Sequence, residues 1–95
     1  VNVMGTKHVV RAAMEAKIER MVFTGSFSSV GFDPDDPARA MNEDAPFYPF
    51  FPWLPYARTK VLAELEVMKG VARGLDCVIA TSCACIGPND FVPSR

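Results

Sequence analysis

The chain has 95 residues, of which 49% are hydrophobic and 22% are charged, and its formal net charge is -1. This length allows at most one domain with a modest core, and the composition is that of an ordinary soluble globular protein. The net charge of -1 gives no indication of a nucleic-acid-binding protein, which would need a basic face. No apolar run approaches the ~18 residues that span a bilayer, and no signal-peptide pattern is present.

The cysteines favour a reducing compartment. Cys77, Cys83 and Cys85 make an odd count, and the last two lie too close in sequence for a usual disulfide. They also lack the C-x-x-C spacing and the nearby histidine of a zinc site, so no metal is expected. We therefore expect a cytoplasmic protein whose cysteines are small buried hydrophobic residues on and after a strand.

The first third of the chain predicts a helix, a strand and a turn. Residues 1–17 carry a broad apolar face at helical spacing. Residues 20–25 are a compact β-prone run, which predicts a buried strand, and residues 26–31 are a Ser/Gly-rich turn. The apolar face of the helix consists of Val3, Met4, Val10, Ala13, Met14 and Ala16.

The remainder predicts a long loop, a second helix and a second strand. Residues 32–55 hold most of the prolines, which forbid regular backbone hydrogen bonding. Residues 56–73 read as a helix that ends before Gly74, a residue suited to the position just past a helix. Residues 75–81 predict a second buried strand. The apolar stripe of the second helix consists of Val61, Leu62, Leu65, Met68 and Val71.

The order of helix, strand, long loop, helix and strand is typical of a parallel α/β sheet. We expect both helices to pack against the same face of that sheet. Two strands do not make a stable sheet alone, so the rest of the sheet is expected outside this sequence. The chain also starts with Val1, and its first residues read as a helix interior, which favours a fragment.

Three residues have the chemistry of a proton-transfer site. Tyr56 and Lys60 are four apart at the start of a helix and so share one face. A free tyrosine has a pKa of about 10, and a nearby cation favours the phenolate. Ser26 follows a predicted parallel strand, at the edge where open α/β sheets bind ligands. Each signal has a plainer alternative: a helix-start contact for the pair, and a turn serine for Ser26.

Several motifs together resemble one family. They are, in chain order, Asn2-Val-x-Gly5-Thr6, Val22-Phe-Thr-Gly-Ser26 with Val30-Gly31, Tyr56-Ala-Arg-Thr-Lys60 with Leu62-Ala-Glu64, Gly74-Leu-Asp, and Gly87-Pro88-x-Asp90. The chain resembles the extended short-chain dehydrogenase/reductases, also called the NAD-dependent epimerase/dehydratase family. Within them it is most similar to the dihydroflavonol-reductase-like carbonyl reductases and hydroxysteroid dehydrogenases. The resemblance implies a fragment of a Rossmann-like doubly wound parallel sheet.

In that reading, residues 1–95 are the central and C-terminal part of one NAD(P)-binding domain, without its first β-α-β unit. The Gly-rich turn that holds the pyrophosphate and the residue that selects NAD or NADP belong to that unit. The sequence therefore does not predict which of the two cofactors is preferred. The resemblance implies a homodimer through the helices of residues 1–17 and 56–73.

The resemblance also implies roles for single residues. Tyr56 would be the general acid/base, and Lys60 would bind the nicotinamide ribose and favour the Tyr56 phenolate. Ser26 would hydrogen-bond the substrate oxygen, Asn2 would help to order the site, and Thr24 would line the cofactor side of the strand end. Further implied cofactor contacts are Ser82, Cys83 and Ala84, and further implied substrate contacts are Ser28 and Cys85.

The sequence departs from the family pattern at three of these places. Gly25 stands where a serine is common, which removes a hydroxyl beside Ser26. Thr59 replaces a common serine before Lys60. Ser82 stands where the family usually has proline, so the backbone beside the nicotinamide is expected to differ.

The long loop bears on the substrate. It ends in the aromatic residues Phe47, Tyr48, Phe50, Phe51 and Trp53. These form either a wall of an apolar substrate pocket or a simple cover over the sheet or a partner contact. The first reading favours an apolar carbonyl or alcohol, because a sugar diphosphate needs basic residues and the loop has only Arg39. A sugar-nucleotide epimerase or dehydratase, a non-catalytic dinucleotide-binding relative and an inert fragment remain the alternatives.

Overall fold

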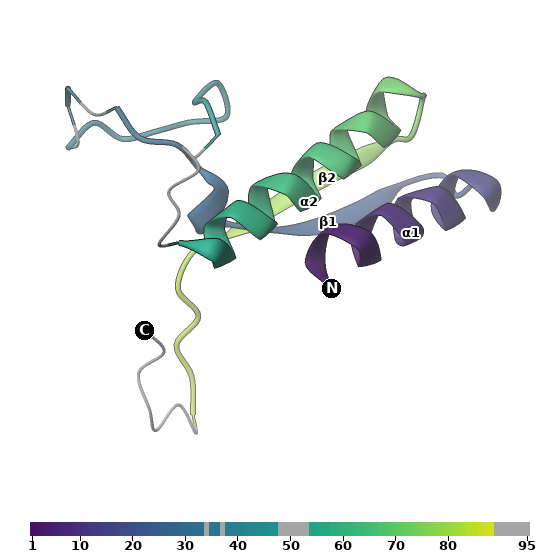
Figure 1. Cartoon of the computed structure of the whole chain (residues 1–95), viewed down its shortest axis with the longest axis horizontal. Helices are drawn as coiled ribbons and strands as arrows, with labels where there is room; N and C mark the ends of the chain where they lie inside the picture. Colours follow the sequence, from purple (N-terminus) through teal and green to yellow (C-terminus); the bar gives the residue numbers. More distant parts are fainter. Residues whose placement is uncertain (34, 37, 48–53, 89–95) are drawn as a thin grey trace.

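The computed structural model describes residues 1–33, 35, 36, 38–47 and 54–88. The elements are α1 (Asn2–Glu15), β1 (Met21–Ser26), the short 3-10 helix η1 (Phe27–Ser29), α2 (Pro55–Ala72) and β2 (Cys77–Ser82). β1 and β2 pair in parallel from Met21↔Cys77 to Ser26↔Ser82, with α2 as the crossover between them (Figure 1). The predicted α/β class and the predicted order of elements are confirmed.

Both helices lie on one face of the two strands, as predicted (Figure 1). Side chains alternate along a strand, and Met21, Phe23 and Ile79 turn toward the helices. They pack with Val10 and other helix residues into one hydrophobic cluster. Its buried members are Val10, Ala13, Met21, Val67 and Leu75.

The prediction that both strands are buried is wrong for the opposite face of the sheet. There Val22 is 66% exposed and Val78 is 48% exposed, and Thr24 and Ala80 are exposed as well. The physical reason is that both helices pack on the other side, so nothing in the described part of the chain covers this face. In a doubly wound sheet, helices cover both faces.

α1 and α2 end in the same backbone arrangement, but the sequence predicts only the end of α2. Beyond α2, Gly74 has φ +102, and the N–H groups of Gly74 and Leu75 donate to the carbonyls of Val71 and Gly70. This is the Schellman arrangement, and it confirms the prediction for Gly74.

α1 ends at Glu15 rather than at Lys17 as predicted. Lys17 itself takes the left-handed conformation, with φ 52. The N–H groups of Lys17 and Ile18 donate to the carbonyls of Met14 and Ala13, which completes the same motif. Because a lysine rarely marks such a position, the sequence carries no stop signal there.

The predicted apolar stripe of α2 divides between two faces of the helix. Val61 is buried, but Leu62 and Leu65 are only half-buried, and Met68 and Val71 are exposed. Small residues let α2 approach its neighbours closely, and hydrophobicity alone does not reveal them. The buried residues of α2 are Ala57, Val61, Ala63, Glu64, Val67 and Gly70.

Gly70 of α2 packs tightly against Val10 of α1. A Cβ added there would lie 2.6 Å from the Val10 Cγ1 methyl and 3.2 Å from Leu75 Cδ2. Gly70→Ala is therefore expected to destabilise the full-length protein by about 1–3 kcal/mol, although alanine is the better helix former. Urea unfolding measures this. Val10→Ala removes the obstructing methyl, so the double variant should lose less than the sum of the two single losses. Simple additivity would contradict this account.

The cysteines follow the prediction only in part. Cys77 packs against the core cluster, and burial raises the pKa of its thiol. Cys83 and Cys85 are exposed rather than buried, because they lie past the end of β2 where no element covers them in the described residues. All three thiols are free.

Two segments of the loop between η1 and α2, at residues 30–31 and 46–47, lie side by side. The N–H of Gly31 donates to the carbonyl of Pro46 at 2.8 Å, and Val30 and Phe47 form an isolated antiparallel bridge. Of the predicted aromatic run, Tyr48, Phe50, Phe51 and Trp53 lie outside the described residues, as does Asp90 of the last motif. Among the helices of the described residues, none is long and apolar enough to cross a membrane.

Candidate active site

Ser26 is the last residue of β1 and caps the helix η1 that follows. Its Oγ accepts a hydrogen bond from the Ser28 N–H at 3.2 Å, as expected of a residue in extended conformation before a helical turn. Its register partner is Ser82, so the carboxyl ends of both strands meet at one edge. Since the Ser26 oxygen already accepts from the backbone, its own O–H remains available as a donor to a substrate oxygen.

Tyr56 and Lys60 occupy the first turns of α2. Pro55 takes the first helical position, where its missing N–H costs nothing and its fixed φ suits the helix. The Lys60 ammonium lies 5.7 Å from the centroid of the Tyr56 ring, which is within cation–π range. Tyr56 is exposed and Lys60 half-buried. The shared face expected from their spacing is therefore present.

Asn2 connects the first helix to this turn. Its amide donates to Thr59 Oγ1 at 3.2 Å, and the Thr59 hydroxyl donates to the Tyr56 carbonyl at 2.8 Å. Asn2 thus reaches the backbone of Tyr56 through one intermediate side chain. The hydroxyl of Thr59 makes the link, and the serine common in the family would carry the same group.

A buried polar pair lies behind the site, and the sequence reasoning gave it no role. The Ser29 hydroxyl lies 2.6 Å from Glu64 Oε1 and 2.7 Å from the carbonyl oxygen of Ser26. Ser29 is 1% exposed and Glu64 is 6% exposed. The available signal was spacing: residues 56, 60 and 64 recur every four positions and so share one side of a helix.

An apolar cavity of about 880 Å³ opens beside Tyr56. Aromatic and aliphatic side chains dominate its wall, and within the described residues Arg39 is its one cation, paired with Asp33 at 3.6 Å. The lining residues are Phe27, Ser28, Val30, Gly31, Phe32, Arg39, Ala40, Met41, Asn42, Glu43, Leu54, Tyr56, Ala57, Thr81 and Cys83. Ser26 and Lys60 stand next to it without lining it.

The remaining predicted site residues lie along the same edge. Ser28 and Cys83 line the cavity, while Thr24 is exposed on the bare face of the sheet, in register with Ala80. Ser82 continues β2 by one residue beyond the predicted strand. Ala84 and Cys85 follow it without regular structure and are exposed.

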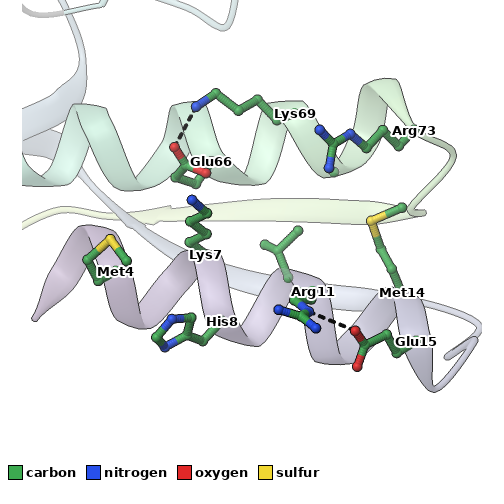
Figure 2. Close-up of a pocket in the computed structure, with 11 residues that line it drawn as sticks. Met4, Lys7, His8, Arg11, Met14, Glu15, Glu66, Lys69 and Arg73 are labelled. Carbon is green, nitrogen blue, oxygen red and sulfur yellow. Dashed lines mark hydrogen bonds and ion pairs between the residues drawn. The ribbon is translucent and has the colours of Figure 1, made fainter.

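A second groove, of about 480 Å³, lies between α1 and α2 (Figure 2), and Tyr56 is not among its lining residues. Its rim is charged. Arg11 pairs with Glu15 within α1, and Lys69 pairs with Glu66 within α2. The hydrogen bond from Lys69, together with the charges of Lys69, Lys7 and Arg73, lowers the pKa of Glu66 below its ordinary value. This groove holds no member of the predicted catalytic set.

The Asn2–Thr59 link gives a testable expectation. Thr59→Ala removes the hydroxyl and should destabilise the full-length protein by about 0.5–1.5 kcal/mol, the usual worth of a hydrogen bond. Thr59→Ser keeps the hydroxyl and should behave as the wild type. Asn2→Ala should add little in the Thr59→Ala background, because the acceptor of Asn2 is already gone. Thermal unfolding of the four proteins tests this, and a serine variant as unstable as the alanine variant would contradict it.

Comparison with known proteins agrees with this arrangement of a parallel β-α-β unit and motif residues at its carboxyl edge. The matching family model and the relatives place the chain among the extended short-chain dehydrogenase/reductases, a class of oxidoreductases and epimerases. This confirms the resemblance. The chain belongs to the 3-beta hydroxysteroid dehydrogenase/isomerase family, whose sequence model matches residues 1–86.

Curated relatives match along nearly the whole chain. Sterol demethylase protein B of Methylococcus capsulatus is 42% identical over 99% of this chain and 28% of its own length. A putative dihydroflavonol 4-reductase of Synechocystis is 31% identical over 98% of this chain and 26% of its own. Cinnamoyl-CoA reductase 1 of Petunia hybrida is 34% identical over 90% of this chain and 27% of its own. The chain thus spans about a quarter of the length of these relatives.

Proposed function

We propose that this chain carries the catalytic residues of an NAD(P)-dependent oxidoreductase that interconverts an apolar carbonyl compound and its alcohol. The observation that carries the proposal is the position of Tyr56. It shares one helical face with Lys60, borders an apolar cavity and stands at the start of the helix that packs against the Ser26 turn. The names of the relatives, which include two reductases, support the same reaction type.

The chain's own residues would divide the reaction as follows. The Ser26 hydroxyl donates a hydrogen bond to the carbonyl oxygen and polarises the C=O bond. Tyr56 transfers its hydroxyl proton to the same oxygen, which becomes the alcohol oxygen. The Lys60 ammonium places a positive charge beside the phenolate that forms. Oxidation of an alcohol runs through the same contacts in reverse. A bound nicotinamide supplies or accepts the hydride.

The residues present fit the nicotinamide and ribose end of such a cofactor. Within the described part of the chain, no carboxylate pairs with the Lys60 ammonium, so its N–H donors remain available for ribose hydroxyls. Ser82, Cys83 and Ala84 are exposed at the edge where both strands end, and Thr24 is exposed on the bare face of the sheet two residues before that edge. Open α/β sheets bind their ligands at that edge.

The cavity favours an apolar substrate over a sugar nucleotide. A diphosphate is held largely by cationic side chains, and within the described residues the one cation that lines this cavity, Arg39, is already paired with Asp33. The wall is instead formed by side chains such as Phe27, Phe32 and Met41. Small-molecule sites with such linings bind ligands mainly through apolar contact.

The direct test uses the full-length protein with NADH and NADPH. Hydrophobic ketones and aldehydes, and the matching alcohols with the oxidised cofactors, should be turned over with a change in nicotinamide absorbance. Sugar nucleotides should be neither reduced nor epimerised. Turnover of sugar nucleotides alone would replace this proposal by an epimerase. Cofactor binding without any turnover would replace it by a non-catalytic dinucleotide-binding role.

We further propose that residues 1–95 lack the part of the domain that holds the cofactor pyrophosphate. Calorimetry of the 95-residue chain with either cofactor should then show no strong binding, because no helix among the described residues begins after a Gly-rich turn that could hold the phosphates. Micromolar affinity of the isolated chain would refute this.

Free cysteines agree with the cytoplasm as the place of action.

A homodimer through α1 and α2 is part of the same proposal. α2 turns a second apolar surface away from the sheet, beside Val3 of α1. A groove of about 380 Å³ there is lined by Leu62, Leu65, Met68 and Ala72 among others. Sedimentation of the full-length protein should give twice the monomer mass, and a concentration-independent monomer would refute the dimer without touching the reaction.

A further inference from the structure

The buried pair of Glu64 and Ser29 joins the two parts of the site. Glu64 lies one turn beyond Lys60 and two turns beyond Tyr56 on α2. Ser29 is the last residue of η1, the turn that Ser26 begins. The hydroxyl oxygen of Ser29 lies within hydrogen-bond distance of both the Glu64 carboxyl group and the Ser26 carbonyl oxygen, at 2.6 and 2.7 Å. This buried contact therefore joins the turn of residues 26–29 (the serine turn) to α2, the helix that carries Tyr56 (the tyrosine helix).

Gly25 provides the space for this carboxyl group. A Cβ at that position would lie 2.9 Å from Glu64 Oε1 and 3.0 Å from Thr81 Oγ1. Real Cβ atoms essentially never lie within 3.0 Å of another heavy atom, so a side chain here would force the Glu64 carboxyl group to shift. The family's common serine at this position is absent, and the Glu64–Ser29 contact occupies the place of its side chain.

The pair is too deeply buried to touch a substrate, so its effect must pass through Ser26. We infer that Glu64, acting through Ser29, is the positioning residue that holds the Ser26 hydroxyl in place relative to Tyr56. The inference rests on the proposed function, since it assigns a role within that reaction. A buried polar group is costly unless it is hydrogen-bonded, and the Ser29 hydroxyl provides that contact for Glu64.

The main test is Ser29→Ala in the full-length protein, a change that removes the bridging hydroxyl and little volume. Turnover should fall about tenfold, the equivalent of one hydrogen bond to a charged group, and the KM of the cofactor should stay the same. In a Ser26→Ala background the same substitution should change nothing further, because its effect passes through Ser26. Glu64→Ala should resemble Ser29→Ala, and Glu64→Gln should restore most of the turnover, because its amide group can still hydrogen-bond with the Ser29 hydroxyl.

Glu66→Gln is the matched control. It alters a carboxyl group two positions along the same helix whose partner is Lys69 and should leave turnover unchanged. Hydrogen exchange gives a readout independent of activity: the Ser28 amide, which donates to Ser26 Oγ, should exchange faster in Ser29→Ala.

Three outcomes would overturn the inference. They are unchanged turnover in Ser29→Ala, an equal loss in the wild-type and Ser26→Ala backgrounds, and an unchanged exchange rate of the Ser28 amide. Tyr56→Phe, run in parallel, separates the two levels of argument. If Tyr56→Phe is inactive and Ser29→Ala is not impaired, only the positioning role fails. If Tyr56→Phe is fully active, the proposed function itself fails.

Discussion

Tyr56→Phe in the full-length protein is expected to lower turnover by about 10²–10⁴-fold, the usual contribution of a positioned proton donor. The substitution removes one hydroxyl and keeps the ring that lies beside Lys60 and borders the cavity. Cofactor affinity should therefore hardly change. Steady-state kinetics with a reducible carbonyl, together with cofactor titration by fluorescence, measures both quantities on one protein.

Two further substitutions separate the roles in the proposed site. Lys60→Ala should weaken cofactor binding as well as turnover, because Lys60 is proposed to contact the ribose. Ser26→Ala should lower turnover and leave cofactor affinity nearly intact, because its hydroxyl faces the substrate oxygen in the proposal. A Tyr56→Phe protein that binds the cofactor and retains the original turnover would refute the mechanism.

Gly31→Ala is expected to raise the KM of an apolar substrate by about 10–100-fold, with a smaller effect on turnover at saturation. An added Cβ would lie 2.0 Å from the carbonyl oxygen of Pro46, a backbone atom that cannot turn aside. The hydrogen bond between Gly31 and Pro46 must then break, and the loop that carries Phe32 and Met41 moves away from the cavity. The estimate corresponds to about 1.4–2.8 kcal/mol, close to one buried apolar side chain.

Asp36→Ala is the control for this prediction, because it changes an exposed side chain within the same loop. It should leave KM and turnover as they are. If Gly31→Ala keeps its affinity for apolar substrates of every size, the loop does not form the substrate wall. The reading of the loop as a simple cover would then be preferred.

The features that could be predicted from the sequence are those encoded locally. Hydrophobic period and turn residues indicated two helices and two strands in the right order, and Gly74 marked the end of α2 because glycine suits a left-handed position. The four-residue spacing of Tyr56 and Lys60 fixed their common face without any knowledge of the tertiary structure.

The features that escaped prediction depend on contacts between distant segments. Ser29 and Glu64 are 35 positions apart, and Asn2 and Thr59 are 57 apart, so no local pattern announces either contact. The tight packing of α2 against Val10 of α1 depends on Gly70, which a hydrophobicity pattern does not single out. The bare face of the sheet likewise depends on where both helices pack, which neither strand's own sequence reveals.

The backbone hydrogen bond between Gly31 and Pro46 has a consequence for how substrate specificity can change within this family. It brings the two ends of the intervening segment together, and the serine turn and the tyrosine helix lie outside that closed segment. Lengthening a flexible loop costs little, about 0.6 kcal/mol for each doubling of its length. In the proposed mechanism, insertions, deletions or exchanges between Gly31 and Pro46 would alter the substrate wall and leave Ser26 and Tyr56, which lie outside this segment, in place.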